Sequence, residues 1–136
     1  MAKYKLHKSS IGYKTVSIEK DTATVITAGD LVALDGSDLA IVATSGSTKV
    51  AFAPNGAGDG DLNVEVTVGN DFELKGTGDA VWAESYRGDL VDINSTTQTI
   101  DIGVSSTDVL QFSAAEEAGV VGSTDDMIVK INKPIF

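Results

Sequence analysis

The sequence contains no cysteine, so disulfide bonds, Cys-x-x-Cys redox chemistry and cysteine-ligated zinc sites are all excluded. It has one histidine, His7, which excludes sites with several histidine ligands and most histidine-based catalysis. No apolar run reaches about 18 residues, so we expect no transmembrane helix. The N-terminal lysines are not followed by an apolar segment, so we also expect no secretory signal.

Residues that could carry out catalysis or bind a metal do not form a recognisable set. His7 has no neighbouring carboxylate that would fix its tautomer. The segment Asp59–Glu65 has oxygen ligands at alternate positions, but an EF-hand calcium loop requires glycine where Val64 stands. Arg87–Asp89 spells the tripeptide that integrins bind, but the same Gly-Asp pair opens another apolar run at residue 29. We therefore expect no enzyme, no cofactor and no metal site.

Charge is distributed unevenly along the chain. The formal net charge of −10 and the pI near 4.3 argue against nucleic-acid binding through the body of the protein. Residues 1–20 hold five lysines and one glutamate, a net charge of +4, whereas the other 116 residues hold five basic and nineteen acidic residues, a net charge of −14. We expect a basic N-terminal arm, residues 1–14, ahead of a single acidic domain, residues 15–136. Such asymmetry is typical of an interaction tail, and a solvated first strand rich in lysine is the alternative.

Apolar residues recur with a period of two over most of the body, which is typical of half-buried antiparallel strands. In Asp61–Gly69, for example, the apolar residues occupy the even positions and the polar residues the odd ones. Turn residues separate such runs. The sequence therefore predicts an all-β fold, a compact antiparallel barrel or sandwich of short strands. The expected strands are Thr15–Glu19, Ala23–Thr27, Asp30–Leu34, Leu39–Thr44, Lys49–Ala53, Asp61–Gly69, Asp71–Leu74, Ala80–Ala83, Leu90–Ile93, Thr99–Val104, Val109–Phe112 and Met127–Ile131.

One short helix is expected over residues 113–118. Ser113 and Glu116 form a capping-box pattern, in which each side chain bonds the backbone amide of the other residue. Alanines follow the cap, and Gly119 can end the helix in a left-handed conformation.

Residues 29–35 and 88–94 share a pattern in which Gly-Asp opens an apolar run and Asp or Asn closes it. A second apolar run follows in both cases, over residues 39–46 and 99–106. We interpret this echo as the same kind of hairpin used twice, 59 residues apart.

The body from Thr22 to Ile131 opens with a short strand into AGDLVALDG and continues through a hairpin and a glycine-rich loop to FELKGTGDAVWAESYRGDLVDI. It closes with IGVSS, a short Ala/Glu segment and MIVKIN. In this order of motifs, and in its small, acidic, cysteine-free composition, the chain resembles the capsid cement, or head decoration, proteins of tailed bacteriophages and prophages. The residues that carry the resemblance are Phe72, Leu74, Ala80, Trp82, Gly88, Val91 and Gly103.

The resemblance implies a non-enzymatic structural protein of the virion, made in the host cytoplasm. Such a protein binds the exterior of an assembled capsid, with the major capsid protein as its partner, and stabilises the capsid, commonly as a homotrimer. It implies no cofactor, no nucleic-acid partner and no membrane partner.

On this interpretation, the N-terminal arm makes the principal contact with the capsid. Its lysines would reverse the sign of the acidic body locally, and its tyrosines would serve as apolar anchors. We expect removal of residues 2–14 to abolish binding and to leave the body folded. The C-terminal Ile135 and Phe136 are candidates for self-association, with packing onto the chain's own core as the alternative. The expected capsid-binding residues are Lys3, Tyr4, Lys5, Lys8, Tyr13 and Lys14.

The alternative function is a carbohydrate- or host-surface-binding β-sandwich module of a fibre or adhesin. Such a module would need a row of exposed aromatic residues. Aromatic residues make up only 6% of the sequence and are dispersed along it, and the basic arm would have no evident purpose. A small hydrolase is a third interpretation, which no catalytic set supports.

Overall fold

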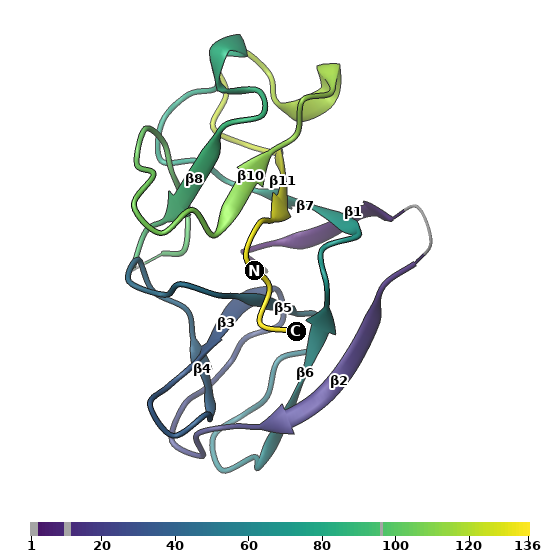
Figure 1. Cartoon of the computed structure of the whole chain (residues 1–136), viewed down its shortest axis with the longest axis vertical. Coiled ribbons are helices and arrows are strands. Elements are labelled where there is room, and N and C mark those ends of the chain that lie inside the picture. Colours follow the sequence, from purple (N-terminus) through teal and green to yellow (C-terminus); the bar gives the residue numbers. More distant parts are fainter. Residues whose placement is uncertain (1–2, 10–11, 96) are drawn as a thin grey trace.

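The computed structural model describes residues 3–9, 12–95 and 97–136, and over these residues the chain is almost entirely β structure (Figure 1). The expected all-β antiparallel fold is confirmed in its sandwich form, since the sheets pack on one another without closing into a barrel. The strands are β1 (Lys5–Ser9), β2 (Lys14–Glu19), β3 (Asp30–Leu34), β4 (Ala40–Val42), β5 (Ala51–Ala53), β6 (Asn63–Val68), β7 (Phe72–Gly76), β8 (Leu90–Ile93), β9 (Ile100–Asp101), β10 (Leu110–Phe112) and β11 (Met127–Ile131).

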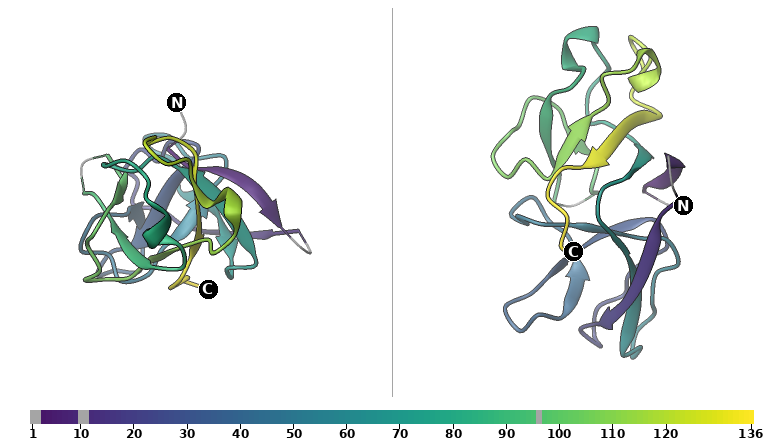
Figure 2. Two further views of the ribbon diagram at one scale, coloured as in Figure 1. Left: turned by 90° about the horizontal axis from the view of Figure 1, so that it is seen from above. Right: turned by 45° about the vertical axis from the view of Figure 1, so that its right-hand side comes forward.

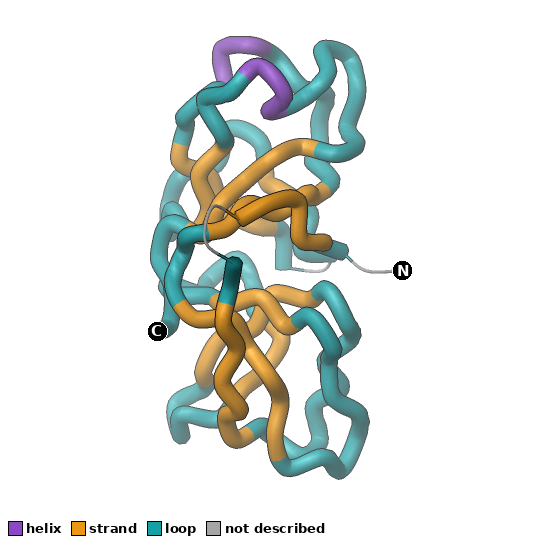
Figure 3. The backbone as a smooth tube through the Cα atoms, turned by 90° about the vertical axis from the view of Figure 1, so that its right-hand side faces the viewer, coloured by secondary structure: helices purple, strands orange, loops and turns teal. Residues whose placement is uncertain are grey.

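The strands form three sheets in two lobes (Figures 1 and 3). The upper lobe is a six-stranded sheet in the order β1-β7-β11-β10-β8-β9, together with the 3₁₀ turns η1 (Glu84–Tyr86) and η2 (Glu116–Ala118). The lower lobe holds a three-stranded sheet, β4-β3-β5, and a two-stranded ribbon, β2-β6. Every pair of these strands is antiparallel.

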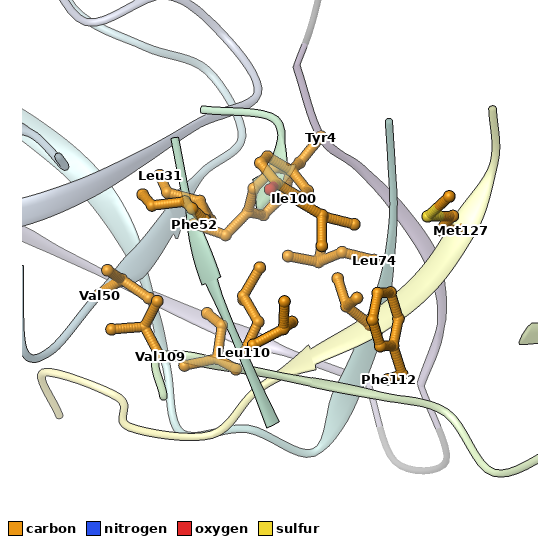
Figure 4. Close-up of a cluster of buried hydrophobic side chains, with 14 of the residues drawn as sticks. Tyr4, Leu31, Val50, Phe52, Leu74, Ile100, Val109, Leu110, Phe112 and Met127 are labelled. Carbon is orange, nitrogen blue, oxygen red and sulfur yellow. The ribbon is translucent and has the colours of Figure 1, made fainter. Parts of the chain in front are cut away.

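The three-stranded sheet is buried on both faces. Leu31 and Ala33 of β3 face a large apolar cluster shared with the six-stranded sheet, part of which is drawn in Figure 4. Val32 faces a smaller cluster, which Val64 and Val66 of the β2-β6 ribbon close from the other side. Because alternate residues of a strand point to opposite faces, a strand between two cores must be apolar throughout. This requirement accounts for the uninterrupted run Leu-Val-Ala-Leu in β3.

Three strands, β3, β8 and β11, begin and end at the residues that the sequence predicts. Two expected strands are wrong. In Ala23–Thr27, only Ile26 makes an isolated bridge, to Ala57, because residues 21–24 form a tight turn before it. In Ala80–Ala83, only Trp82 makes a bridge, to Val121, and its indole ring is buried against Phe112.

The expected helix over residues 113–118 is also wrong, because only the single 3₁₀ turn η2 forms there. The Ser113 hydroxyl accepts a hydrogen bond from the amide of Ala115, so the capping box is not made. Gly119 is extended, with φ −174° and ψ 173°. A Cβ atom at this glycine would overlap the ring of Trp82, so the backbone crosses the indole at a distance that only glycine allows.

The N-terminal segment is part of the fold and does not form a separate arm. Residues 5–9 pair with β7 at the edge of the six-stranded sheet, and Lys14 already belongs to β2. The side chain of Tyr4 is only 1% exposed and lies in the large cluster (Figure 4). Removing residues 2–14 would take a strand and a core ring from the molecule, so we now expect the truncation to destabilise the body. Met1, Ala2, Ser10 and Ile11 of the expected arm lie outside the described residues.

The two segments that share the Gly-Asp pattern, which begin at residues 29 and 88, form similar hairpins. β3 pairs with β4 and β8 pairs with β9, and a residue in the left-handed region precedes each return strand. These residues are Asp38, with φ 62°, and Gln98, with φ 56°. The difference lies in their side chains, because Asp38 is exposed whereas Gln98 is 1% exposed.

Gln98 joins the two lobes through its buried amide. Its Oε1 accepts a hydrogen bond from the Leu31 amide at 2.9 Å, and its Nε2 donates to the carbonyls of Leu31 and Ala43 at 2.7 and 2.9 Å. Its own carbonyl accepts the hydroxyl of Tyr4 at 2.7 Å. One side chain of the upper lobe thus bonds three buried backbone groups of the three-stranded β4-β3-β5 sheet (the central sheet) and of Ala43, which follows β4, as a neighbouring strand would.

We predict that Gln98→Ala lowers the free energy of unfolding by about 2–4 kcal/mol, because it leaves buried backbone groups without partners. Gln98→Asn tolerates the left-handed backbone but has too short a side chain to reach β3, so it should lose most of the same stability. Urea denaturation followed by tryptophan fluorescence measures both variants, with the exposed neighbour Thr97→Ala as the control. A Gln98→Asn variant as stable as the parent would show that the bonds to Leu31 and Ala43 contribute little.

Candidate partner-binding surface

The candidate surface lies along β1 and β2, which follow one another along the chain and form one side of the molecule (Figure 2, right). β1 is an edge strand of the six-stranded sheet, and β2 is the outer strand of the two-stranded ribbon. Lysines at sheet edges are a common feature, since their charges oppose pairing with another chain. Part of the lysine content of the N-terminus therefore has a structural explanation.

Two of the expected contact residues hold the fold together. The Lys3 ammonium lies 3.2 Å from a carboxylate oxygen of Asp30, a buried residue at the start of β3. The phenol of Tyr4 donates to the Gln98 carbonyl, and burial raises its pKa far above the ordinary tyrosine value. Tyr4 therefore cannot anchor a partner, and the expectation that it does so is wrong.

Lys20, which adds to the basic charge of the first 20 residues, is also internal. It is 2% exposed, and its ammonium donates to the backbone carbonyls of Asp21, Thr22 and Thr24. An ammonium has three hydrogens, so these carbonyls satisfy it without a carboxylate partner. The sequence carries no signal for this arrangement, because its acceptors are backbone groups.

Lys5 and Lys8 are exposed, but each lies near an acidic group of the body. The Lys8 ammonium is 3.2 Å from the carboxylate of Glu117 and 3.9 Å from that of Glu73, and Lys5 is 4.0 Å from Asp126. The ring of His7 lies 3.5 Å from the same oxygen of Glu117. These neighbours reduce the positive potential of β1, so the basic stretch of sequence does not become an equally basic surface.

Tyr13 and Lys14 lie at the start of β2 and are exposed. The ring of Tyr13 tilts against Phe72, with the ring centroids 5.9 Å apart, which fixes its position beside the strand. Lys14 has no carboxylate within 4 Å among the described residues. These two residues are the members of the expected set whose groups are most available to a partner.

The two C-terminal candidates differ. Ile135 is half-buried and packs against the smaller cluster, and its amide donates to the carbonyl of Val50. Phe136 is 48% exposed, and its backbone carbonyl accepts the Gly69 amide at the end of β6. The alternative of packing onto the chain's own core therefore holds for Ile135, whereas Phe136 remains available for contact.

The described residues form neither a metal-binding cluster nor a membrane-spanning helix. In the described ranges, no three His, Cys, Asp or Glu residues gather closely enough to hold a metal ion. No helix among them is long and apolar enough to span a membrane. Comparison of the chain with protein-family models, with curated proteins and with solved structures found no match in any of the three.

The His7–Lys8–Glu117 contact predicts a pH effect. The hydrogen bonds and charges of Lys8 and His7 lower the pKa of the Glu117 carboxyl. A carboxyl whose pKa is lower in the folded state stabilises the fold above its ordinary range, and this contribution is lost as the pH falls through the lowered pKa. We expect Glu117→Gln to lower the urea midpoint slightly at pH 7, with the difference from the parent shrinking between about pH 5 and about pH 3.

Glu116→Gln is the matched control, since the neighbouring Glu116 carboxylate makes no ion pair in the described part of the chain. It should leave the midpoint unchanged across the same pH range. Equal effects of the two variants would mean that the contact with β1 does not stabilise the fold.

Proposed function

We propose that the protein is a structural protein of a phage virion that binds the exterior of the assembled capsid and stabilises it. The proposal rests on the resemblance of residues 22–131 to capsid cement proteins. The observation in the structure that supports it is the exposed side of β1 and β2, where Tyr13 and Lys14 are most available to a partner and Lys5 and Lys8 are exposed beside carboxylates. Lys3 and Tyr4 are excluded from the proposed contact because they stabilise the fold.

The proposed contact combines modest electrostatics with apolar burial. Each exposed ion pair contributes about 0.2–1 kcal/mol, so the available lysines alone give weak binding. Tyr13 adds an aromatic surface held in place by Phe72, which costs little conformational entropy on binding. Copies acting together would raise the effective affinity, and we retain the trimer as part of the proposal, with the exposed Phe136 as a candidate contact between copies.

Carbohydrate binding has less support from the described residues. Trp82, the single tryptophan of the sequence, is 1% exposed and is covered by Tyr86 and Phe112. The exposed aromatic rings are Tyr13 and Phe136, which belong to separate elements and form no row. We therefore keep the fibre or adhesin module as an outcome of the test below.

Co-sedimentation with expanded capsids of the phage that encodes the chain tests the proposal. The parent protein should sediment with capsids, and Lys8→Gln/Lys14→Gln should bind about 2- to 30-fold more weakly, as two exposed ion pairs predict. Lys49→Gln/Lys133→Gln makes the same change in net charge at exposed positions elsewhere and should bind like the parent. Retention of the parent on a glycan array without capsid binding would overturn the proposal in favour of the adhesin module.

A further inference from the structure

The loop between β5 and β6 contains the one asparagine of the sequence that precedes a glycine, Asn55 before Gly56. The side chain of Asn55 is exposed, and its Nδ2 donates a hydrogen bond to Oε2 of Glu65 in β6 at 2.8 Å. Water can replace either partner of an exposed hydrogen bond, so this contact opens readily. The amide group of Asn55 is therefore accessible for reaction.

The packing of the loop requires glycine at residue 56. The backbone of Gly56 has a φ of 68°, which lies in the left-handed region. A Cβ atom there would overlap the carbonyl oxygen of Ile26 and would lie 2.6 Å from the nitrogen of Ala28. Gly56 therefore cannot be replaced by a residue whose side chain would shield its own backbone nitrogen.

The backbone nitrogen of Gly56 is also free, since its N–H donates to no acceptor among the described residues. The two amides that follow it are bonded. Ala57 donates to the carbonyl of Ile26 at 2.7 Å, and Gly58 donates to the carboxylate of Asp61 at 2.8 Å. A backbone nitrogen must lose its proton to attack a carbonyl carbon, and a hydrogen bond to a fixed acceptor opposes that loss. The nitrogen next to Asn55 has no such bond.

The other asparagines of the sequence lack this combination. Each precedes a residue whose side chain crowds the backbone nitrogen that would attack; they are Asn63, Asn70, Asn94 and Asn132. Asp59 also precedes a glycine, but the amide of Gly60 donates to the carbonyl of Thr22 at 2.8 Å. Sequence and hydrogen bonding thus single out the pair of Asn55 and Gly56.

We propose that Asn55 is a site of spontaneous deamidation. The nitrogen of Gly56 loses its proton to solvent and attacks Cγ of Asn55, and the bond between Cγ and Nδ2 breaks, so that ammonia leaves with a proton from solvent. The product is a five-membered succinimide ring. Water then opens the ring, which gives aspartate if the new bond to Cγ breaks and isoaspartate if the original peptide bond breaks. The reaction consumes one water molecule and needs no oxidant or reductant.

Both products change the contacts of the loop. Each has a carboxylate in place of the amide that donated to Glu65, so repulsion between like charges replaces a hydrogen bond. Isoaspartate also adds one atom to the backbone between β5 and Ala57, whose amide and carbonyl both bond Ile26. The modification therefore weakens the attachment of the loop to β6 and to Ile26. It concerns the chain itself and does not rest on the proposed function.

Incubation of the full chain in water enriched in a heavy oxygen isotope, at physiological pH and temperature, tests the site by peptide mapping with mass spectrometry. Oxygen from this water enters the product when the ring opens, which distinguishes the reaction from conversion during sample handling. We expect labelled product at Asn55 before any other asparagine, at a rate within about tenfold of that in the chain unfolded by urea. Asn55→Gln would have to close a six-membered ring, so it should abolish labelling at this residue. Greater protection by the fold, or a rate no faster than at the other asparagines, would overturn the proposal.

A second experiment measures what the modification does to the fold. Asn55→Asp is identical to one of the two products, and its urea midpoint at pH 7 should lie below that of the parent, because two carboxylates then face each other. Asn55→Asp/Glu65→Gln reverses the direction of the hydrogen bond, since the amide now donates from β6, and it should recover the loss. Equal midpoints for Asn55→Asp and the parent would overturn the proposed effect on the loop.

Discussion

The buried amide of Gln98 is the contact on which the arrangement of the two lobes depends. It enters the central sheet from the β8-β9 turn and bonds Leu31 and Ala43, which otherwise would have unpaired backbone groups in an apolar core. The hydroxyl of Tyr4 bonds the backbone of the same residue, so the first strand is joined to this point as well. The left-handed backbone of Gln98 has a modest cost for a non-glycine residue, which these bonds offset.

Two buried aspartates, Asp30 in the three-stranded sheet and Asp92 in the six-stranded sheet, are held by backbone amides. Asp30 opens β3 between the two clusters, where its carboxylate accepts the Thr27 amide and meets the Lys3 ammonium. Asp92 in β8 is buried in a similar way and accepts amides from the loop of residues 106–108. A buried carboxylate is tolerated only with such partners, so each of these aspartates fixes a loop to a strand.

The sequence predicts the elements whose pattern is local, and it misses those that depend on distant backbone. β3, β8 and β11 follow from their apolar runs and flanking turn residues, and the two hairpins follow from the Gly-Asp echo. The helix at residues 113–118 fails because the packing of Gly119 on Trp82 outweighs helix propensity. In the candidate surface, Tyr4 and Lys3 could not be told apart from Tyr13 and Lys14, since only the fold shows which of them meet Gln98 and Asp30.

The charge asymmetry of the chain has a different meaning once the lysines are placed. Lys3 pairs with the buried Asp30, and the buried Lys20 donates to backbone carbonyls. Lys8 lies near both Glu73 and Glu117, so much of the N-terminal positive charge is offset by neighbouring groups. The bulge in β1 and its lysines oppose pairing of this strand with another strand. β2 has its charged residues, Lys14 and Glu19, only at its two ends. Net positive charge is therefore a poor guide to the surface along β1 and β2, where the carboxylates near Lys5 and Lys8 offset part of it.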